Sequence, residues 1–400
     1  MSAPPRAQVP PPLITRSFLL LVAAHFLTSL GYSSLLLLPL YLQHLGADRE
    51  EIGVIMATAA VSGILTRPAV AWMLDRWGRK PVVVMGTAIT GVSMLMLAAV
   101  VRIDMIIYLE RAILGAGLGA VFTGYFTFAA DIVPQERRTE GLALFGASGL
   151  VPLLINPFAD QIGISVPGLR WFLPAIGILI LLSLLILWRI PEPESVAGSR
   201  PPMRRALGAL VHASLWPVWL ATITFGGLVA LFMTFATVAA EERGVENAPS
   251  LWLTYALGAV LVRLLGGRVP DRLGPSNLVA PAIGLYVGAL LLAAMAHDFG
   301  DFLVAATMAG VGHGYCFPVL SGQVVSRMPA TFRGSGVALF TALWGVSELL
   351  ITPLFGAIAD ARGDAAMFVL AACAAVVCLL IWAALEHLVG HRPQSPPPDS

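Results

Sequence analysis

Charged side chains are scarce in this sequence. They make up 12% of the 400 residues, and the mean hydropathy is +0.83. Soluble domains carry about 25% charged residues, so this chain has too little charge to cover a surface that faces water. It contains instead many apolar stretches of about 20 residues, the length that a helix needs to cross a bilayer. We therefore expect an all-α membrane protein rather than a soluble helical domain.

Cysteine and the common catalytic motifs are also scarce or absent. The three cysteines, Cys316, Cys373 and Cys378, all lie in apolar stretches without a CxxC pair, so neither a disulfide framework nor a metal site is indicated. The sequence contains no Walker motif and no nucleophile–base constellation. The run Gly115-x-Gly117-x-Gly119 lies in an apolar stretch with no preceding strand, so close helix packing explains it better than dinucleotide binding. We expect no enzyme, no cofactor and no bound metal.

Twelve membrane spans can be placed along the chain. They divide into two halves of six, at residues 17–190 and 215–387, joined by a polar linker at 191–214. The flanking segments 1–16 and 388–400 are expected to be tails, and the proline-rich start lacks the features of a cleavable signal. The predicted spans are 17–41, 52–74, 81–101, 105–130, 141–161, 171–190, 216–240, 250–269, 278–297, 302–325, 336–360 and 365–387.

The distribution of positive charge predicts the orientation of these spans. If the N-terminus is cytoplasmic, sixteen of the 24 Lys and Arg residues lie on the cytoplasmic side, five are external and three lie within spans. Cytoplasmic loops of membrane proteins are enriched in Lys and Arg. We therefore expect a multi-pass protein of the cell membrane with both termini in the cytoplasm.

The two halves repeat each other. Four blocks recur in the same order, at an offset of 195 or 196 residues. Parallel six-span halves related by an axis along the membrane normal are typical of transporters. The matched blocks are Arg67, Asp75 and Gly78 with Arg263, Asp271 and Gly274; Gly115 to Phe122 with Gly310 to Phe317; Arg138 to Phe145 with Arg333 to Phe340; and Pro157 with Pro353.

Two motifs carry a family resemblance. Asp75-Arg76-x-Gly78-Arg79-Lys80 follows the second span and has a shorter copy, Asp271-Arg272-x-Gly274, after the eighth. Leu109-x-Arg111-x-x-x-Gly115-x-Gly117 lies in the fourth span. Together with the twelve spans, these motifs resemble the major facilitator superfamily (MFS), closest to its drug and metabolite exporters. One departure is Ala71, where the family usually has glycine.

The resemblance implies a role for the loop that follows the second span. The family aspartate, here Asp75, would dock at the start of the eleventh span near Gly336. The neighbouring arginines would meet an acidic residue at the foot of the fourth span, here Asp131. Such contacts would exist only while the cytoplasmic side is closed. Alternatively, these charges act only as topology signals.

Charged residues within spans are costly in a bilayer and need a partner, a cavity or a function. Glu348 lies near the middle of the eleventh span and could carry a proton, or could be a hydrogen-bonded core carboxyl. Arg111 could face a cavity or form a structural pair with a neighbouring helix. Arg67 and Arg263 lie two turns before a cytoplasmic loop, and we expect them to extend toward the headgroups.

The fifth span departs from the exporter pattern Gly-x-x-x-Gly-Pro-x-x-Gly. The aligned residues are Pro152, Asn156, Pro157 and Asp160, so only the proline agrees. Asn156 would face the cavity or a partner helix, and Asp160 would lie near the external mouth. Export and uptake both remain open at this point.

These observations favour a secondary transporter that moves a small organic molecule by alternating access, with protons as the coupling ion. Proton-coupled export is the first hypothesis, proton-coupled uptake the second, and a receptor or enzyme on the same scaffold the third. We expect a monomer in a lipid bilayer that binds no nucleic acid. The candidate cavity and coupling residues are His25, Tyr32, Arg111, Tyr125, Asn156, Phe232, His313, Tyr315 and Glu348.

Overall fold

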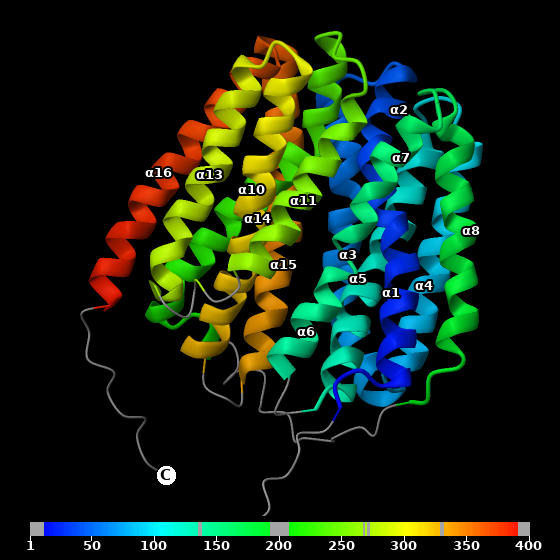
Figure 1. Cartoon of the computed structure of the whole chain (residues 1–400), viewed down its shortest axis with the longest axis vertical. Coiled ribbons are helices and arrows are strands. Elements are labelled where there is room, and N and C mark those ends of the chain that lie inside the picture. The colour runs from blue at the N-terminus through cyan, green and yellow to red at the C-terminus, as the bar shows by residue number, and fades with distance from the viewer. Residues whose placement is uncertain are drawn as a thin grey trace, which may run out of the picture.

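Long helices run side by side through the molecule in two groups (Figure 1). The computed structural model describes residues 12–134, 138–192, 208–266, 269, 273–328 and 332–390, and these contain helices and turns but no strand. The chain enters α1 and leaves α16 at the same end of the molecule, which we name the terminal end. The opposite end, where α2 turns into α3, is named the Arg49 end.

The N-terminal half contains six spans, of which two contain more than one α-helix. The first span is α1 continued through the 3₁₀ turn η1 into α2, and the fifth consists of α6, η4 and α7. Its elements are α1 (Arg16–Ser34), η1 (Leu35–Leu37), α2 (Leu38–His44), α3 (Arg49–Arg76), α4 (Arg79–Met96) with η2 (Leu97–Ala99), α5 (Met105–Ile132), α6 (Arg138–Ala147), η4 (Val151–Leu154), α7 (Ile155–Gln161) and α8 (Leu169–Leu187).

The C-terminal half repeats this order with more regular helices. Its fifth span, α15, is a single helix of 30 residues with Pro353 inside it. The elements are η5 (Ala213–Leu215), α10 (Trp216–Glu242), η6 (Ala248–Ser250), α11 (Leu251–Gly266), α13 (Pro275–Met295), α14 (Phe299–Arg327), α15 (Arg333–Arg362) and α16 (Asp364–Gly390).

Local chemistry explains where several helices begin. Asp48, Asp104 and Asp298 each precede a helix and accept a hydrogen bond from a backbone N–H of its first turn. Gly78 and Gly274, equivalent glycines of the repeat, precede α4 and α13 with φ of 92° and 82°. A side chain is strained at such angles, so glycine at both positions allows the sharp entry into the next helix.

Ten helical segments of the described residues are long and apolar enough to cross a membrane. The remaining two expected spans are the fifth and the eighth. In the described part of the eighth, α11 has 16 residues. The fifth is not one helix, contrary to our expectation for 141–161, because the chain turns between Ala147 and Val151. Glycine at 146 and 149 and the missing N–H of Pro152 weaken helical bonding at this point.

Glycines allow close contact between helices inside each half. A Cβ atom at Gly115 of α5 would overlap the carbonyl oxygen of Ala59 in α3. At the equivalent Gly310 of α14, it would overlap the carbonyl oxygen of Tyr255 in α11. The glycine run of the repeat therefore packs equivalent helix pairs together, as expected from its apolar context. Between the halves, α3 packs along α15.

Candidate functional site

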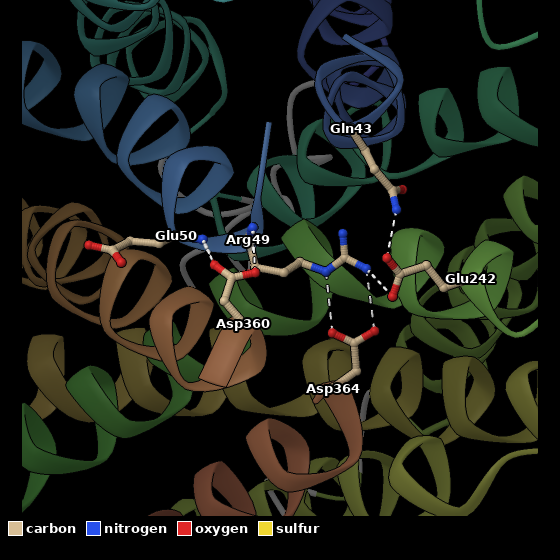
Figure 2. Close-up of polar contacts among 6 residues, drawn as sticks. All are labelled: Gln43, Arg49, Glu50, Glu242, Asp360 and Asp364. Carbon is tan, nitrogen blue, oxygen red and sulfur yellow. Dashed lines mark hydrogen bonds and ion pairs between the residues drawn. The ribbon is translucent and has the colours of Figure 1, made fainter. Parts of the chain in front are cut away.

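Arg49, the first residue of α3, joins the N-terminal half to three helix ends of the other half. Its Nη2 atom lies 2.5 Å from the Glu242 carboxylate at the end of α10. Its Nε and Nη2 atoms donate to the two carboxylate oxygens of Asp364, the first residue of α16, at 3.3 and 3.4 Å. Figure 2 shows the guanidinium between these two carboxylates.

Asp360, near the end of α15, caps α3 from the other half. Its carboxylate accepts hydrogen bonds from the backbone N–H groups of Arg49 and Glu50, at 2.9 and 2.6 Å. A carboxylate is favourable at a helix N-terminus, where the N–H groups have no helical acceptor. Figure 2 shows this cap on the other side of Arg49 from Glu242. The Arg49 cluster consists of Gln43, Arg49, Glu50, Glu242, Asp360 and Asp364.

The Arg49 cluster joins the two halves at this end of the molecule. The Arg49 side chain is only 6% exposed, so its ion pairs are less screened by water than those of surface pairs. Gln43 of α2 adds a bond to Glu242 at 2.7 Å, and Ser250 donates to Asp160 of α7 at 3.2 Å. All these contacts link the two halves. Sequence reasoning placed Arg49 among the external charges and missed this role, because its partners are far away in the chain.

At the terminal end, the described ion pairs lie within one half. Arg79 of α4 meets Asp131 of α5 at 2.7 Å, the pair that the family resemblance implied for this loop. Both helices belong to one half, so the expectation that this pair exists only while the cytoplasmic side is closed was wrong. Lys80 donates to the carbonyls of Trp188 and Ile190, directly after α8. In the C-terminal half, Arg327 of α14 pairs with Glu386 of α16.

The expected docking of Asp75 lies outside what the structure describes. The Asp75 side chain, Asp271 and Arg272 are not among the described parts of the chain. Arg76 lies over the ring of Trp72, at 5.7 Å from its centroid. Gly336 is packed against Val324 and Met328 of its own half.

Arg67 and Arg263 do not extend toward the headgroups, so that expectation was wrong. Arg67 of α3 donates to the Ala338 carbonyl at 3.2 Å and to the hydroxyl and carbonyl of Thr341 at 2.7 and 2.8 Å, all on α15 of the other half. Arg263 of α11 donates to the Gly314 carbonyl of α14 at 3.3 Å. Both guanidiniums bind nearby backbone carbonyls of the protein instead of lipid headgroups.

Arg111 is paired with its chain neighbour. Its Nε and Nη2 atoms lie 2.6 and 2.9 Å from the two carboxylate oxygens of Glu110, and both side chains are buried. Neither of the two environments foreseen for Arg111, an open cavity and a pair with another helix, describes this contact. A bidentate pair of this kind satisfies both charges in a dry interior.

Glu348 lies at the middle of α15 and is partly buried. Among the described residues, no hydrogen-bond or ion-pair partner lies within bonding distance of its carboxyl. Arg111, from the other half, attracts it electrostatically. Because Arg111 is already bound by Glu110, Glu348 is left as a carboxyl without a direct counter-ion at the interface between the halves.

An aromatic cluster surrounds His313 in the C-terminal half. The Tyr255 hydroxyl lies 2.6 Å from His313 Nδ1 and 3.0 Å from the Tyr286 hydroxyl. Trp344, one turn before Glu348 on the same face of α15, has its ring centroid 5.7 Å from that of His313. Phe232, expected in a cavity, is fully buried against Tyr255 and Trp252.

Tyr315 lies apart from this cluster. It lines an apolar groove of about 550 Å³ between α11 and α14. Adjacent positions on a helix differ by about 100°, so Tyr315 is on the other side of α14 from His313. The structure therefore does not bring these two candidates together.

Polar residues of α1 bind the broken fifth span. His25 Nδ1 lies 2.7 Å from Ser148 Oγ, and the Tyr32 hydroxyl donates to the Gly149 carbonyl at 3.2 Å. Asn156 donates to the carbonyls of Ser33 and Leu153 at 3.1 and 3.0 Å. Tyr125 of α5 bonds Thr28 at 3.1 Å. The bonds of Tyr32 and Asn156 satisfy the Gly149 and Leu153 carbonyls at the break, a requirement within a bilayer.

A family model described as Major Facilitator Superfamily matches residues 20–347 and 248–400. The chain belongs to this superfamily. It is 25% identical to an uncharacterized MFS-type transporter of Salmonella typhimurium, over 92% of this chain and 95% of that protein. It is 24% identical to the uncharacterized MFS-type transporter YhhS of Escherichia coli, over 86% and 85%.

Solved structures show the same fold. The nucleoside transporter NupG superposes with a TM-score of 0.77 at 15% identity, over 92% of this chain and all of that one. A bacterial homologue of the human lysosomal transporter Spinster gives 0.71 at 14% identity, over 93% and 96%. The MFS protein is therefore a multi-pass transporter of the cell membrane with the twelve-helix fold.

Proposed function

We propose that this MFS protein moves a small organic molecule across the cell membrane by alternating access between its two halves, and that proton movement drives export. The observation that carries the proposal is the difference between the two ends of the molecule. Ion pairs join the halves at the Arg49 end, whereas the described ion pairs at the terminal end join helices of one half.

That difference is what one state of a rocking transporter requires. Contacts that exist in one state bias the equilibrium toward it, and they must break when the other end closes. With both termini in the cytoplasm, as the distribution of Lys and Arg predicts, the Arg49 cluster is on the external side. The structure then corresponds to a state closed to the outside.

Glu348 supports proton coupling. Its carboxyl lies at the interface between the halves and has no direct counter-ion among the residues that the structure describes, so protonation would change the charge at the contact that rearranges. Arg111 supplies an attraction only while Glu348 is charged. A proton on Glu348 would weaken this attraction across the halves, which links proton binding to the relative position of the halves.

Inverted membrane vesicles with an acidified lumen and an internal pH-sensitive dye would test the proposal. A panel of organic cations, anions and neutral aromatic compounds would be added at the cytoplasmic face. Proton-coupled export predicts that a transported compound raises the luminal pH, because each compound entering the vesicle exchanges for protons leaving it. Vesicles without the protein supply the baseline.

The alternative results are equally distinct. Compound uptake together with protons into right-side-out vesicles would show symport and would contradict export. If transport occurs in either orientation without any pH change, proton coupling is wrong while the transporter assignment stands.

A further inference from the structure

Arg67 and Arg263 are equivalent residues of the repeat, yet they bind differently. Arg67 donates three hydrogen bonds across the interface to α15. Arg263 donates one described bond, at 3.3 Å, to Gly314 of its own half. A guanidinium carries five N–H donors, so Arg263 leaves most of its donors without a described protein acceptor. Of the two equivalent arginines, only Arg67 therefore makes a described contact with the other half.

The repeat identifies where the missing contact would form. Ala338 and Thr341, the acceptors of Arg67, correspond at an offset of 195 to Ala143 and Gly146 of α6. Both positions fall in or directly after the matched block that begins at Arg138 and Arg333. Because α3 corresponds to α11 and α15 to the fifth span, the equivalent acceptors for Arg263 are backbone carbonyls of α6.

The surface of α6 at this point is free to receive a side chain. A Cβ atom at Gly146 would meet nothing within 4 Å. The Gly146 carbonyl accepts one bond, from the Gly149 N–H, and a carbonyl oxygen has a second lone pair for a further donor. Because Gly146 has no side chain, its carbonyl is not covered. The equivalent residue of the other half, Thr341, has a hydroxyl instead.

The helix α11 already packs against other pieces of the fifth span. At the Arg49 end, α11 packs against η4 and α7, the other pieces of the same broken span. At the terminal end, α6 and α11 belong to different groups of helices (Figure 1). If α11 pivots on its contact with η4 and α7, closing the terminal end brings it toward α6.

We propose that Arg263 docks on the Ala143 and Gly146 carbonyls of α6 in the state closed at the terminal end. In the present state it is held by Gly314. The contact corresponds to that of Arg67 with α15, which is already made in the present state, and it stabilises the state in which α6 and α11 meet at the terminal end. This inference rests on the proposed alternating access.

Distances between spin labels would test it in the full-length protein in lipid nanodiscs. Labels at Leu144→Cys and Leu265→Cys, in a chain whose three cysteines are replaced by serine, report the separation of α6 and α11. Leu265 is 83% exposed. We expect a long distance from the present state and a shorter one from the closed state. Arg263→Ala should lower the ratio of short to long by about tenfold, as expected for loss of a charged hydrogen bond.

Gly146→Leu provides a second variant that is compatible with the present state, because its Cβ enters open space. It should lower the same ratio, and adding Arg263→Ala to it should change little more, since both remove one contact. The control Arg189→Ala removes an exposed positive charge from the terminal end and should leave the ratio unchanged.

Three outcomes would overturn the inference: an equal effect of Arg189→Ala and Arg263→Ala, additive effects of Gly146→Leu and Arg263→Ala, or one distance in every protein. If Arg49→Met shifts the ratio while Arg263→Ala does not, alternating access stands and only the Arg263 contact is wrong.

Discussion

Arg49 and Asp364 are 315 positions apart in the chain, yet they form a two-pronged contact, Nε to Oδ1 at 3.3 Å and Nη2 to Oδ2 at 3.4 Å. Each residue begins a helix, α3 in one half and α16 in the other. The pair therefore fixes the starts of two spans against each other. Glu242 also pairs with the Arg49 guanidinium, and Asp360 accepts a hydrogen bond from the Arg49 backbone N–H, so three acidic residues of the other half bind this one residue.

Arg49→Met should destabilise the state closed at the Arg49 end. The variant keeps the apolar stem but loses the bonds to Glu242 and Asp364, each worth about 1.5–3 kcal/mol for a charged donor before discounting for the half-exposed Glu242. Ser33→Cys, in a chain without other cysteines, reports access to the buried interior. Its labelling by a membrane-impermeant maleimide should rise by about tenfold or more in whole cells.

Arg102→Met is the matched control, because Arg102 pairs with Asp104 at the same end but is 79% exposed. Exposed pairs contribute about 0–1 kcal/mol. Equal labelling in the Arg49 variant and in this control would show that the Arg49 cluster does not hold the end closed.

Glu348→Gln should remove pH-driven transport and leave the protein folded. The glutamine amide is similar in size to the carboxyl and cannot lose a proton. It mimics the neutral carboxyl, which Arg111 attracts less than the charged one. In the inverted vesicles, a transported compound should no longer change the luminal pH, while exchange of labelled for unlabelled compound continues. Glu246→Gln, at an exposed position, should behave like wild type. Unchanged coupling in the Glu348 variant would remove this residue from the mechanism.

The arrangement of the two halves could be predicted from sequence because it depends on local and repeated signals. Apolar stretches give the spans, and the offset of 195 or 196 residues gives the relation between Gly115 and Gly310, which pack equivalent helix pairs. The break in the fifth span was not predicted. Its segment is mostly apolar, and hydropathy does not register how Gly146, Gly149 and Pro152 interrupt backbone hydrogen bonding.

The site was less predictable, because its contacts join distant parts of the chain. The pair of Arg79 with Asp131 followed from a family motif, whereas Arg49 and its three acidic partners looked like unrelated loop charges. Tyr315 and His313 are two positions apart and so lie on different sides of α14, but only coordinates show that one lines a groove and the other an aromatic cluster. The sequence alone identified residues whose side chains could bind or carry a proton, but it did not show which of them contact one another.

The buried pair of Glu110 and Arg111 makes a specific prediction about stability. Removing one partner leaves an uncompensated buried charge, which costs about 3–5 kcal/mol, whereas replacing both by apolar residues of similar size is much milder. Glu110→Leu and Arg111→Met should each lower the midpoint of thermal unfolding in detergent, and the double variant should recover most of the loss. If the double variant loses as much as the two single variants added together, the pair is not a coupled unit.

Gly115 and Gly146 should respond in opposite ways to the same substitution. At Gly115, the Cβ of alanine would overlap the Ala59 carbonyl, so α5 and α3 must separate, at a cost of about 1–3 kcal/mol or more. At Gly146, the Cβ enters open space, and alanine favours the helical conformation over glycine by about 1 kcal/mol. Thermal unfolding of the purified protein should therefore shift downward for Gly115→Ala and stay level or rise for Gly146→Ala. Equal shifts at both positions would mean that close approach of α5 to α3 does not determine the stability of the N-terminal half, and that the glycine run has another cause.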